Sequence, residues 1–225
     1  MRRLWIGFVP YIAMSVVHVA ALAADAVALA APTKLALMPL LALAVVWGAA
    51  GSSWTGAHTL LLVAIGLSWL GDGAGTFFPF APELPMMLLC FGLAHIAYIV
   101  LFWRRLAVRR VPLWAGVYAV WWIVLLAVLW PHLGGLSFAV AAYGLVLGGT
   151  AVAASRCHPL IVWGSVFFLT SDSVLAFRLF MPDAMPDWTS PLVMLTYCLG
   201  QGLIAAGVVV SVRARRAVAS EPVAV

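Results

Sequence analysis

Long apolar stretches, separated by short segments rich in glycine and proline, dominate the pattern of this sequence. Most stretches are about 20 residues long, the length that a helix needs to cross the hydrocarbon core of a bilayer. Lipid offers no hydrogen-bond partner to backbone groups, so each stretch must be helical. The pattern predicts an all-α integral membrane protein of about eight transmembrane helices, at residues 4–29, 34–50, 58–78, 84–103, 113–130, 136–154, 160–180 and 191–212.

The segments between these stretches carry residues that end helices. Proline cannot continue a helix, and glycine adopts the positive φ that turns require. We therefore expect loops at residues 31–33, 51–53, 79–82, 131–135 and 182–190, and one transmembrane domain covering residues 1–225. The first stretch follows Arg2 and Arg3 and resembles a secretion signal, but Pro10 and His18 interrupt it, and we expect it to be retained.

Composition and charge placement agree with this pattern. The chain is 66% hydrophobic and 8% charged, whereas a soluble domain carries about a quarter of charged residues. Cations concentrate on one side of the predicted topology, which places both termini in the cytoplasm of a cell membrane, most simply a bacterial plasma membrane. The cations of that side are Arg2, Arg3, Arg104, Arg105, Arg109, Arg110, Arg156, Arg213, Arg215 and Arg216.

The formal net charge of +5 therefore reflects topology and gives no indication of a nucleic-acid partner. The tail from Arg213 to Arg216 also suits contact with anionic lipid. The sequence predicts the lipid bilayer as a partner. It does not indicate the oligomeric state.

Two parts of the chain resemble each other. The segment that ends at Asp72 is echoed by the segment that ends at Asp172, and each precedes a helix with one central polar residue, His95 or Gln201. This echo predicts two four-helix halves in parallel orientation around a midplane site, as in some transport proteins.

Polar residues inside predicted spans are costly, so each needs a reason. From the helical rise of about 1.5 Å per residue, four of them fall between the midplane and the outer third of the membrane, where one pocket could hold them all. They are Asp72, His95, Asp172 and Gln201. Tyr98 and Tyr197 lie one turn from two of them. Lys34 and Arg178 lie near the outer edge, where each could anchor a helix or meet an anionic head group.

Two carboxylates in one low-dielectric pocket cannot both ionise easily, so the pair Asp72 and Asp172 would supply one acid and one base. The alternative for these residues, and for His95 and Gln201, is hydrogen bonding that only holds helices together. The sequence lacks paired histidines at helical spacing, and we expect no metal and no other cofactor.

Five blocks of the sequence resemble the YhhN-like family, which contains the lysoplasmalogenases. The blocks are residues 33–34, 70–72, 92–98, 171–176 and 196–204. The family commonly has proline directly after the lysine of the first block, and this chain has Leu35. The resemblance implies a multispan membrane hydrolase that cleaves the vinyl ether bond of lysoplasmalogens to a fatty aldehyde and a glycerophospho-alcohol.

The chemistry implied by this resemblance matches the polar pocket. Asp72 and Asp172 would act as acid and base in either order, and Lys34 and Arg178 would hold the substrate phosphate. His95, Tyr98, Tyr197 and Gln201 would orient water and the ether. Two other classes stay open: a small proton-coupled transporter or lipid handler, which needs a sealed membrane to act, and a structural membrane protein, whose aspartates only pack.

Overall fold

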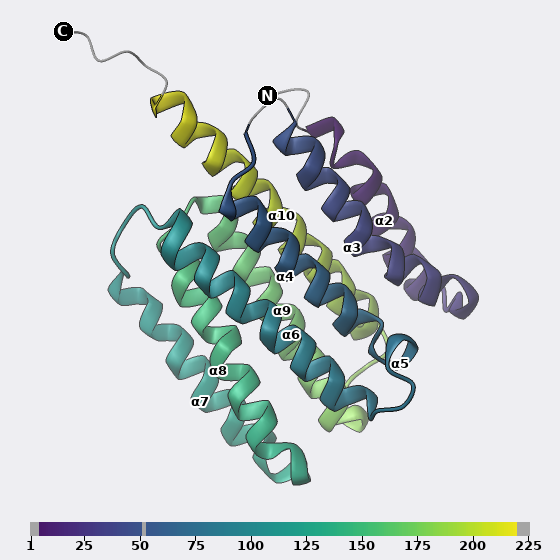
Figure 1. Cartoon of the computed structure of the whole chain (residues 1–225). Helices are drawn as coiled ribbons and strands as arrows, with labels where there is room; N and C mark the ends of the chain where they lie inside the picture. The colour runs from purple at the N-terminus through teal and green to yellow at the C-terminus, as the bar shows by residue number, and fades with distance from the viewer. Residues whose placement is uncertain (1–4, 51–52, 220–225) are drawn as a thin grey trace, which may run out of the picture.

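A computed structural model describes residues 5–50 and 53–219, and within them it shows a bundle of helices and no strand (Figure 1). The α-helices are α2 (Val9–Ala23), α3 (Val27–Ala49), α4 (Gly56–Asp72), α5 (Ala74–Phe77), α6 (Glu83–Val100), α7 (Val117–Leu129), α8 (Ser137–Ala154), α9 (Pro159–Phe180) and α10 (Thr189–Ala219). The π-helical turn η1 (Leu101–Leu106) prolongs α6, and short 3-10 turns are η2 (Leu113–Gly116), η3 (Trp130–His132), η4 (Gly134–Leu136) and η5 (Pro182–Ala184).

The predicted all-helical membrane architecture is confirmed. In the described part of the chain, 6 helical segments are long and apolar enough to cross a membrane: Val27–Ala49, Glu83–Leu106, Leu113–His132, Gly134–Ala154, Pro159–Phe180 and Thr189–Ala217. Helices α2 and α4 are also apolar, but they have only 15 and 17 residues. The count of eight spans and the two four-helix halves therefore stay predictions.

The predicted loop at residues 31–33 is wrong. The chain turns earlier, at Asp25, whose φ is 51°, and α3 already begins at Val27. Pro32 lies inside this helix. Membrane helices tolerate proline when nearby hydroxyl groups bind the backbone that it disturbs. Here the Thr33 hydroxyl contacts the carbonyls of Leu29 and, at 3.2 Å, Ala30.

Other boundaries differ less from the prediction. Helix α4 ends at Asp72 and a break at Gly73 separates it from α5, whereas one span to residue 78 was predicted. Helix α10 begins at Thr189 and includes the arginines that were predicted to follow the last span. The predicted loops at 79–82, 131–135 and 182–190 contain turns and short 3-10 segments, with α10 starting at the end of the last one. Of the loop at 51–53, residues 51–52 lie outside the described residues.

Helices α9 and α10 approach each other closely at two glycines. A Cβ atom added to Gly200 would lie 2.8 Å from the backbone nitrogen of Phe168, and one added to Gly164 would lie 2.8 Å from the carbonyl oxygen of Gly200. Small residues allow such backbone contact between membrane helices, where van der Waals packing and not the hydrophobic effect drives association. This contact fixes the helix of Asp172 against the helix of Tyr197.

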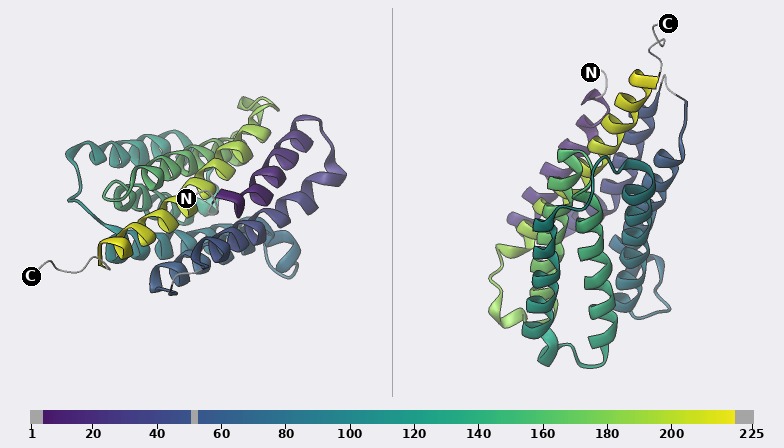
Figure 2. Two further views of the ribbon diagram at one scale, coloured as in Figure 1. Left: turned by 90° about the horizontal axis from the view of Figure 1, so that it is seen from above. Right: turned by 90° about the vertical axis from the view of Figure 1, so that its left-hand side faces the viewer.

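The described segments of the predicted cytoplasmic side meet at one end of the bundle. Arg213 donates to the carbonyl of Gly48 at 2.9 Å, and Arg109 donates to that of Ser155 at 2.8 Å. Arg215 donates to the carbonyl of Arg105 at 2.5 Å. Figure 2 shows α10 extending past its neighbours at this end. Arg2 and Arg3 lie outside the described residues, and the orientation in the membrane stays a prediction.

Candidate functional site

Both central aspartates line one cavity of about 100 Å³ between the helices. This volume is enough for several water molecules. The polar lining residues come from α3, α4, α8, α9 and α10, and the apolar lining residues come from α6, α9 and α10. The polar residues are Lys34, Asp72, Tyr143, Ser171, Asp172 and Tyr197, and the apolar ones are Met87, Leu88, Phe91, Leu175, Val193 and Met194.

Asp72 occupies the last position of α4, and two other helices supply its partners. The hydroxyl of Tyr197 on α10 donates to its Oδ2 at 2.7 Å. The ammonium of Lys34 on α3 lies 3.7 Å from its Oδ1. The Asp72 side chain is 4% exposed and that of Lys34 is 35% exposed, so the ion pair lies at the boundary between the cavity and the surface.

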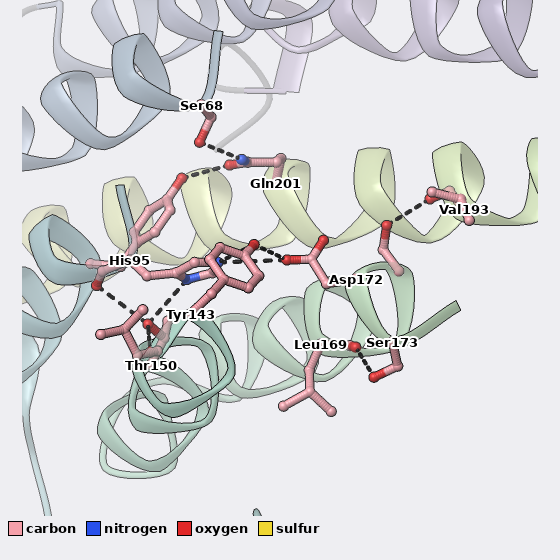
Figure 3. Close-up of polar contacts among 12 residues, drawn as sticks. Ser68, His95, Tyr143, Thr150, Leu169, Asp172, Ser173, Val193 and Gln201 are labelled. Carbon is pink, nitrogen blue, oxygen red and sulfur yellow. Dashed lines mark hydrogen bonds and ion pairs between the residues drawn. The ribbon is translucent and has the colours of Figure 1, made fainter. Parts of the chain in front are cut away.

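Asp172 lies in the second half of α9 and has different partners (Figure 3). The hydroxyl of Tyr143 on α8 donates a hydrogen bond to its Oδ2. Nε2 of His95 on α6 lies 3.8 Å from the same oxygen and 3.4 Å from the Tyr143 hydroxyl. The structure thus brings His95 to the aspartate of the other predicted half, an arrangement that its position in the sequence does not reveal.

Thr150 on α8 orients the His95 ring, which is fully buried. Its hydroxyl lies 3.1 Å from His95 Nδ1 and donates to the carbonyl of Val146 at 2.9 Å. The same hydroxyl lies 3.3 Å from the His95 carbonyl, and with its proton donated to a carbonyl it can accept from Nδ1–H. Nε2 is then the ring nitrogen that faces Asp172, where it can take or give a proton.

A third polar group lies deeper in the bundle and does not line the cavity. The Tyr98 hydroxyl donates to the Gln201 side-chain oxygen at 2.5 Å, and the Gln201 amide donates to Ser68 at 3.1 Å. All three side chains are fully buried. The prediction that one pocket holds all the central polar residues is therefore wrong in part: Gln201 and Tyr98 form interhelical hydrogen bonds away from the cavity wall, and His95 reaches it through Tyr143 and Asp172.

The two predicted phosphate ligands lie in different surroundings. Lys34 lines the cavity beside Asp72. Arg178 does not line it: its guanidinium donates to the Thr189 hydroxyl at 2.5 Å and to the carbonyl of Pro186 at 3.2 Å. Arg178 thereby connects the end of α9 to the start of α10. A role of either residue in phosphate binding stays a prediction.

Sequence reasoning missed Tyr143 and Thr150. Both lie in α8, which was interpreted as an ordinary apolar span. A signal was present, because residues seven apart on a helix share a face, and Tyr143 and Thr150 have this spacing. That face points to His95 and Asp172.

The arrangement defines a class of protein: a multispan helical membrane protein with two carboxylates at one small cavity, one beside a lysine and the other beside a histidine. The family model described as the YhhN family matches residues 29–208, so this chain belongs to the YhhN family, as its sequence blocks indicate. Neither the curated proteins nor the solved structures include a match to this chain.

Proposed function

We propose that this protein is a membrane-embedded hydrolase that cleaves the vinyl ether bond of lysoplasmalogen-like lysophospholipids. One observation carries the proposal: Asp72 and Asp172, from two separate helices, line the same cavity with different partners. Membership in the YhhN family supports the assignment, because the sequence blocks that resemble this family imply a membrane hydrolase of this kind.

The acid is assigned to Asp172. Vinyl ether hydrolysis begins when an acid transfers a proton to the β-carbon, whose double-bond electrons form the new C–H bond. The α-carbon is left as an oxocarbenium ion, similar to the ion that glycosidases form between two carboxylic acids. Asp172 suits this step because the Lys34 ammonium, which favours a charged carboxylate, lies beside the other aspartate.

The base is assigned to Asp72. Its carboxylate is beside the Lys34 ammonium, and it would stabilise the oxocarbenium ion and remove a proton from the attacking water. The hemiacetal that results collapses when Asp172 takes its hydroxyl proton and Asp72 protonates the departing oxygen. The aldehyde and the glycerophospho-alcohol are released, and both aspartates return to their starting protonation states.

The cavity favours a substrate of which only the vinyl ether group and the adjoining carbons enter. A volume of about 100 Å³ is far below the several hundred that a whole drug-sized ligand occupies. Met87, Leu88 and Leu175 supply an apolar wall for the first carbons of the chain, and the remainder would extend between the helices. Lys34 is close enough to the surface to contact the phosphate as well as Asp72.

The test is aldehyde release from lysoplasmenylethanolamine and lysoplasmenylcholine by the purified protein in detergent. We expect Asp72→Asn and Asp172→Asn each to lower the rate by about 10²- to 10⁴-fold, the range for loss of a general acid or base. Asp183→Asn, in the 3-10 turn η5, is the matched control and should retain the rate. A folded wild type that releases no aldehyde from either lipid would sink the proposal, and transport in sealed vesicles would be measured next.

A further inference from the structure

A second cavity, of about 220 Å³, lies at the arginine-rich end of the bundle. Its wall includes three arginine side chains from two regions of the chain, Arg105 of η1 and Arg215 and Arg216 of α10. The remaining wall comes from the start of α4, at Thr55, Gly56 and Ala57, and from the apolar side chains of Leu106 and Val212.

Neighbouring segments place the guanidinium groups of Arg215 and Arg105 at this cavity. Arg215 donates to the backbone carbonyls of Arg105 at 2.5 Å and of Ala107 at 3.2 Å, which fixes the end of α10 against η1. The Arg105 guanidinium lies over the first residue of α4, with Nη2 3.4 Å from the position that a Cβ atom on Gly56 would take. Figure 1 shows that these segments, far apart in the sequence, meet where α10 leaves the bundle.

No acidic residue among those that the structure describes lines this cavity. The described carboxylates lie in the membrane-embedded site or in segments away from the arginines: Asp25, Asp72, Glu83, Asp172, Asp183 and Asp187. Three arginines thus line this cavity, and no carboxylate of the described residues lines it with them. Helix α4 begins at this wall, and helix starts favour anions.

We propose that this cavity binds a phosphate group at the membrane surface. Guanidinium groups match the geometry of phosphate oxygens and donate paired hydrogen bonds to them. Basic pockets between membrane helices bind anionic head groups, and Leu106 and Val212 provide apolar contact for the adjoining glycerol or acyl carbons. The phosphate belongs either to an anionic phospholipid or to a soluble phosphate ester.

Such a ligand would join the helices that carry the first site. Helix α4 ends at Asp72, α6 carries His95 and continues into η1, and α10 carries Tyr197. A phosphate held by all three elements would stabilise their packing from the opposite end. This proposal does not depend on the proposed hydrolase activity, because it concerns binding and stability alone.

The experiment measures the melting temperature of delipidated protein in a neutral detergent. Dioctanoyl phosphatidylglycerol at about five times its Kd should raise it by about 2–4 °C, the change that roughly 1 kcal/mol produces in a protein of this size. Dioctanoyl phosphatidylcholine should not raise it. An equal effect of sn-glycerol 3-phosphate would identify a soluble ester as the source, and an effect of the phosphatidylglycerol alone would identify a lipid.

The double variant Arg105→Gln/Arg216→Gln should lose the shift, and the matched control Arg104→Gln/Arg110→Gln should keep it, because these two arginines lie outside the cavity wall. Gly56→Leu provides a variant that retains every charge but fills the cavity, and it should also lose the shift. No shift in the wild type, or an equal loss in the control variant, would overturn the proposal. So would an equal shift with phosphatidylcholine.

Discussion

The two aspartates of the site lie in similar sequence segments, yet the structure gives them different chemical surroundings. Asp72 ends its helix, contacts the Lys34 ammonium and accepts a hydrogen bond from Tyr197. Asp172 lies within a helix, accepts from Tyr143 and faces the His95 ring. The two echoed segments each end at an aspartate that lines the cavity, and residues of other helices distinguish these aspartates. Two aspartates that the sequence does not tell apart thus have different neighbours: Asp72 lies beside the Lys34 ammonium and Asp172 beside the His95 imidazole.

The cations of the two segments differ in the same way. Lys34 reaches its aspartate from α3, which belongs to neither echoed segment. Arg178 lies on the same helix as Asp172, but its guanidinium binds the start of α10 and not the carboxylate. Proximity in the sequence is thus a poor guide to which cation serves which aspartate.

Among variants of the residues around the two aspartates, Lys34→Met should have the largest effect on activity, because it removes the ammonium beside Asp72. We expect the rate of aldehyde release to fall about 100-fold, because Asp72 loses the cation that supports its charged form as a base. Stability should fall by about 1–2 kcal/mol. This is less than the ~3–5 kcal/mol for breaking a fully buried pair, because Lys34 is 35% exposed. Kinetic assays and thermal unfolding in detergent measure the two effects.

Two further variants separate charge from packing at this position. Lys34→Arg keeps the positive charge and should retain most of the activity. The double variant Lys34→Met/Asp72→Asn removes both charges, and it should recover stability without recovering activity. If Lys34→Met keeps the wild-type rate and melting temperature, the ion pair has no part in the difference between the aspartates.

The next largest effects should come from the two tyrosines, each of which serves one aspartate. Tyr143→Phe should lower the rate about 30-fold and Tyr197→Phe about 10-fold, since a hydrogen bond to a charged group contributes about 1.5–3 kcal/mol. The Tyr143 effect should be larger because its hydroxyl also contacts His95 Nε2. Tyr118→Phe, a buried tyrosine of α7 away from the cavity, is the control. Equal rates for both variants would mean that the two aspartates contribute alike.

The sequence was sufficient to predict the helices, most of their limits, and the positions of the two aspartates. Apolar stretches report the membrane directly, because the cost of exposing backbone to lipid leaves few alternatives. The turn at Asp25 was missed because proline was taken to end a helix, whereas the Thr33 hydroxyl contacts carbonyls of the turn before it.

Side-chain partners were harder to predict than helices. The pairing of His95 with Asp172 and of Tyr98 with Gln201 depends on how helices rotate and pack, which close contacts such as Gly164 with Gly200 determine. Spacing within one helix reveals a shared face but not the helix that it meets. Tyr143 could have been found from its spacing to Thr150, but its partner could not.

Substitution of Arg178 should have the smallest effect on catalysis, and it tests whether Arg178 differs from Lys34 in contacting the substrate. If it contacts the substrate phosphate, Arg178→Gln should raise KM by about two- to fivefold and leave kcat unchanged, as loss of a partly exposed ionic contact does. Thr189→Ala removes the hydroxyl that now binds the guanidinium and keeps the charge. This second variant should leave KM unchanged or lower it, because the freed guanidinium can still reach a phosphate. If both variants lower the melting temperature alike and neither changes KM, Arg178 only connects α9 to α10, and Lys34 is left as the one predicted phosphate ligand at the cavity.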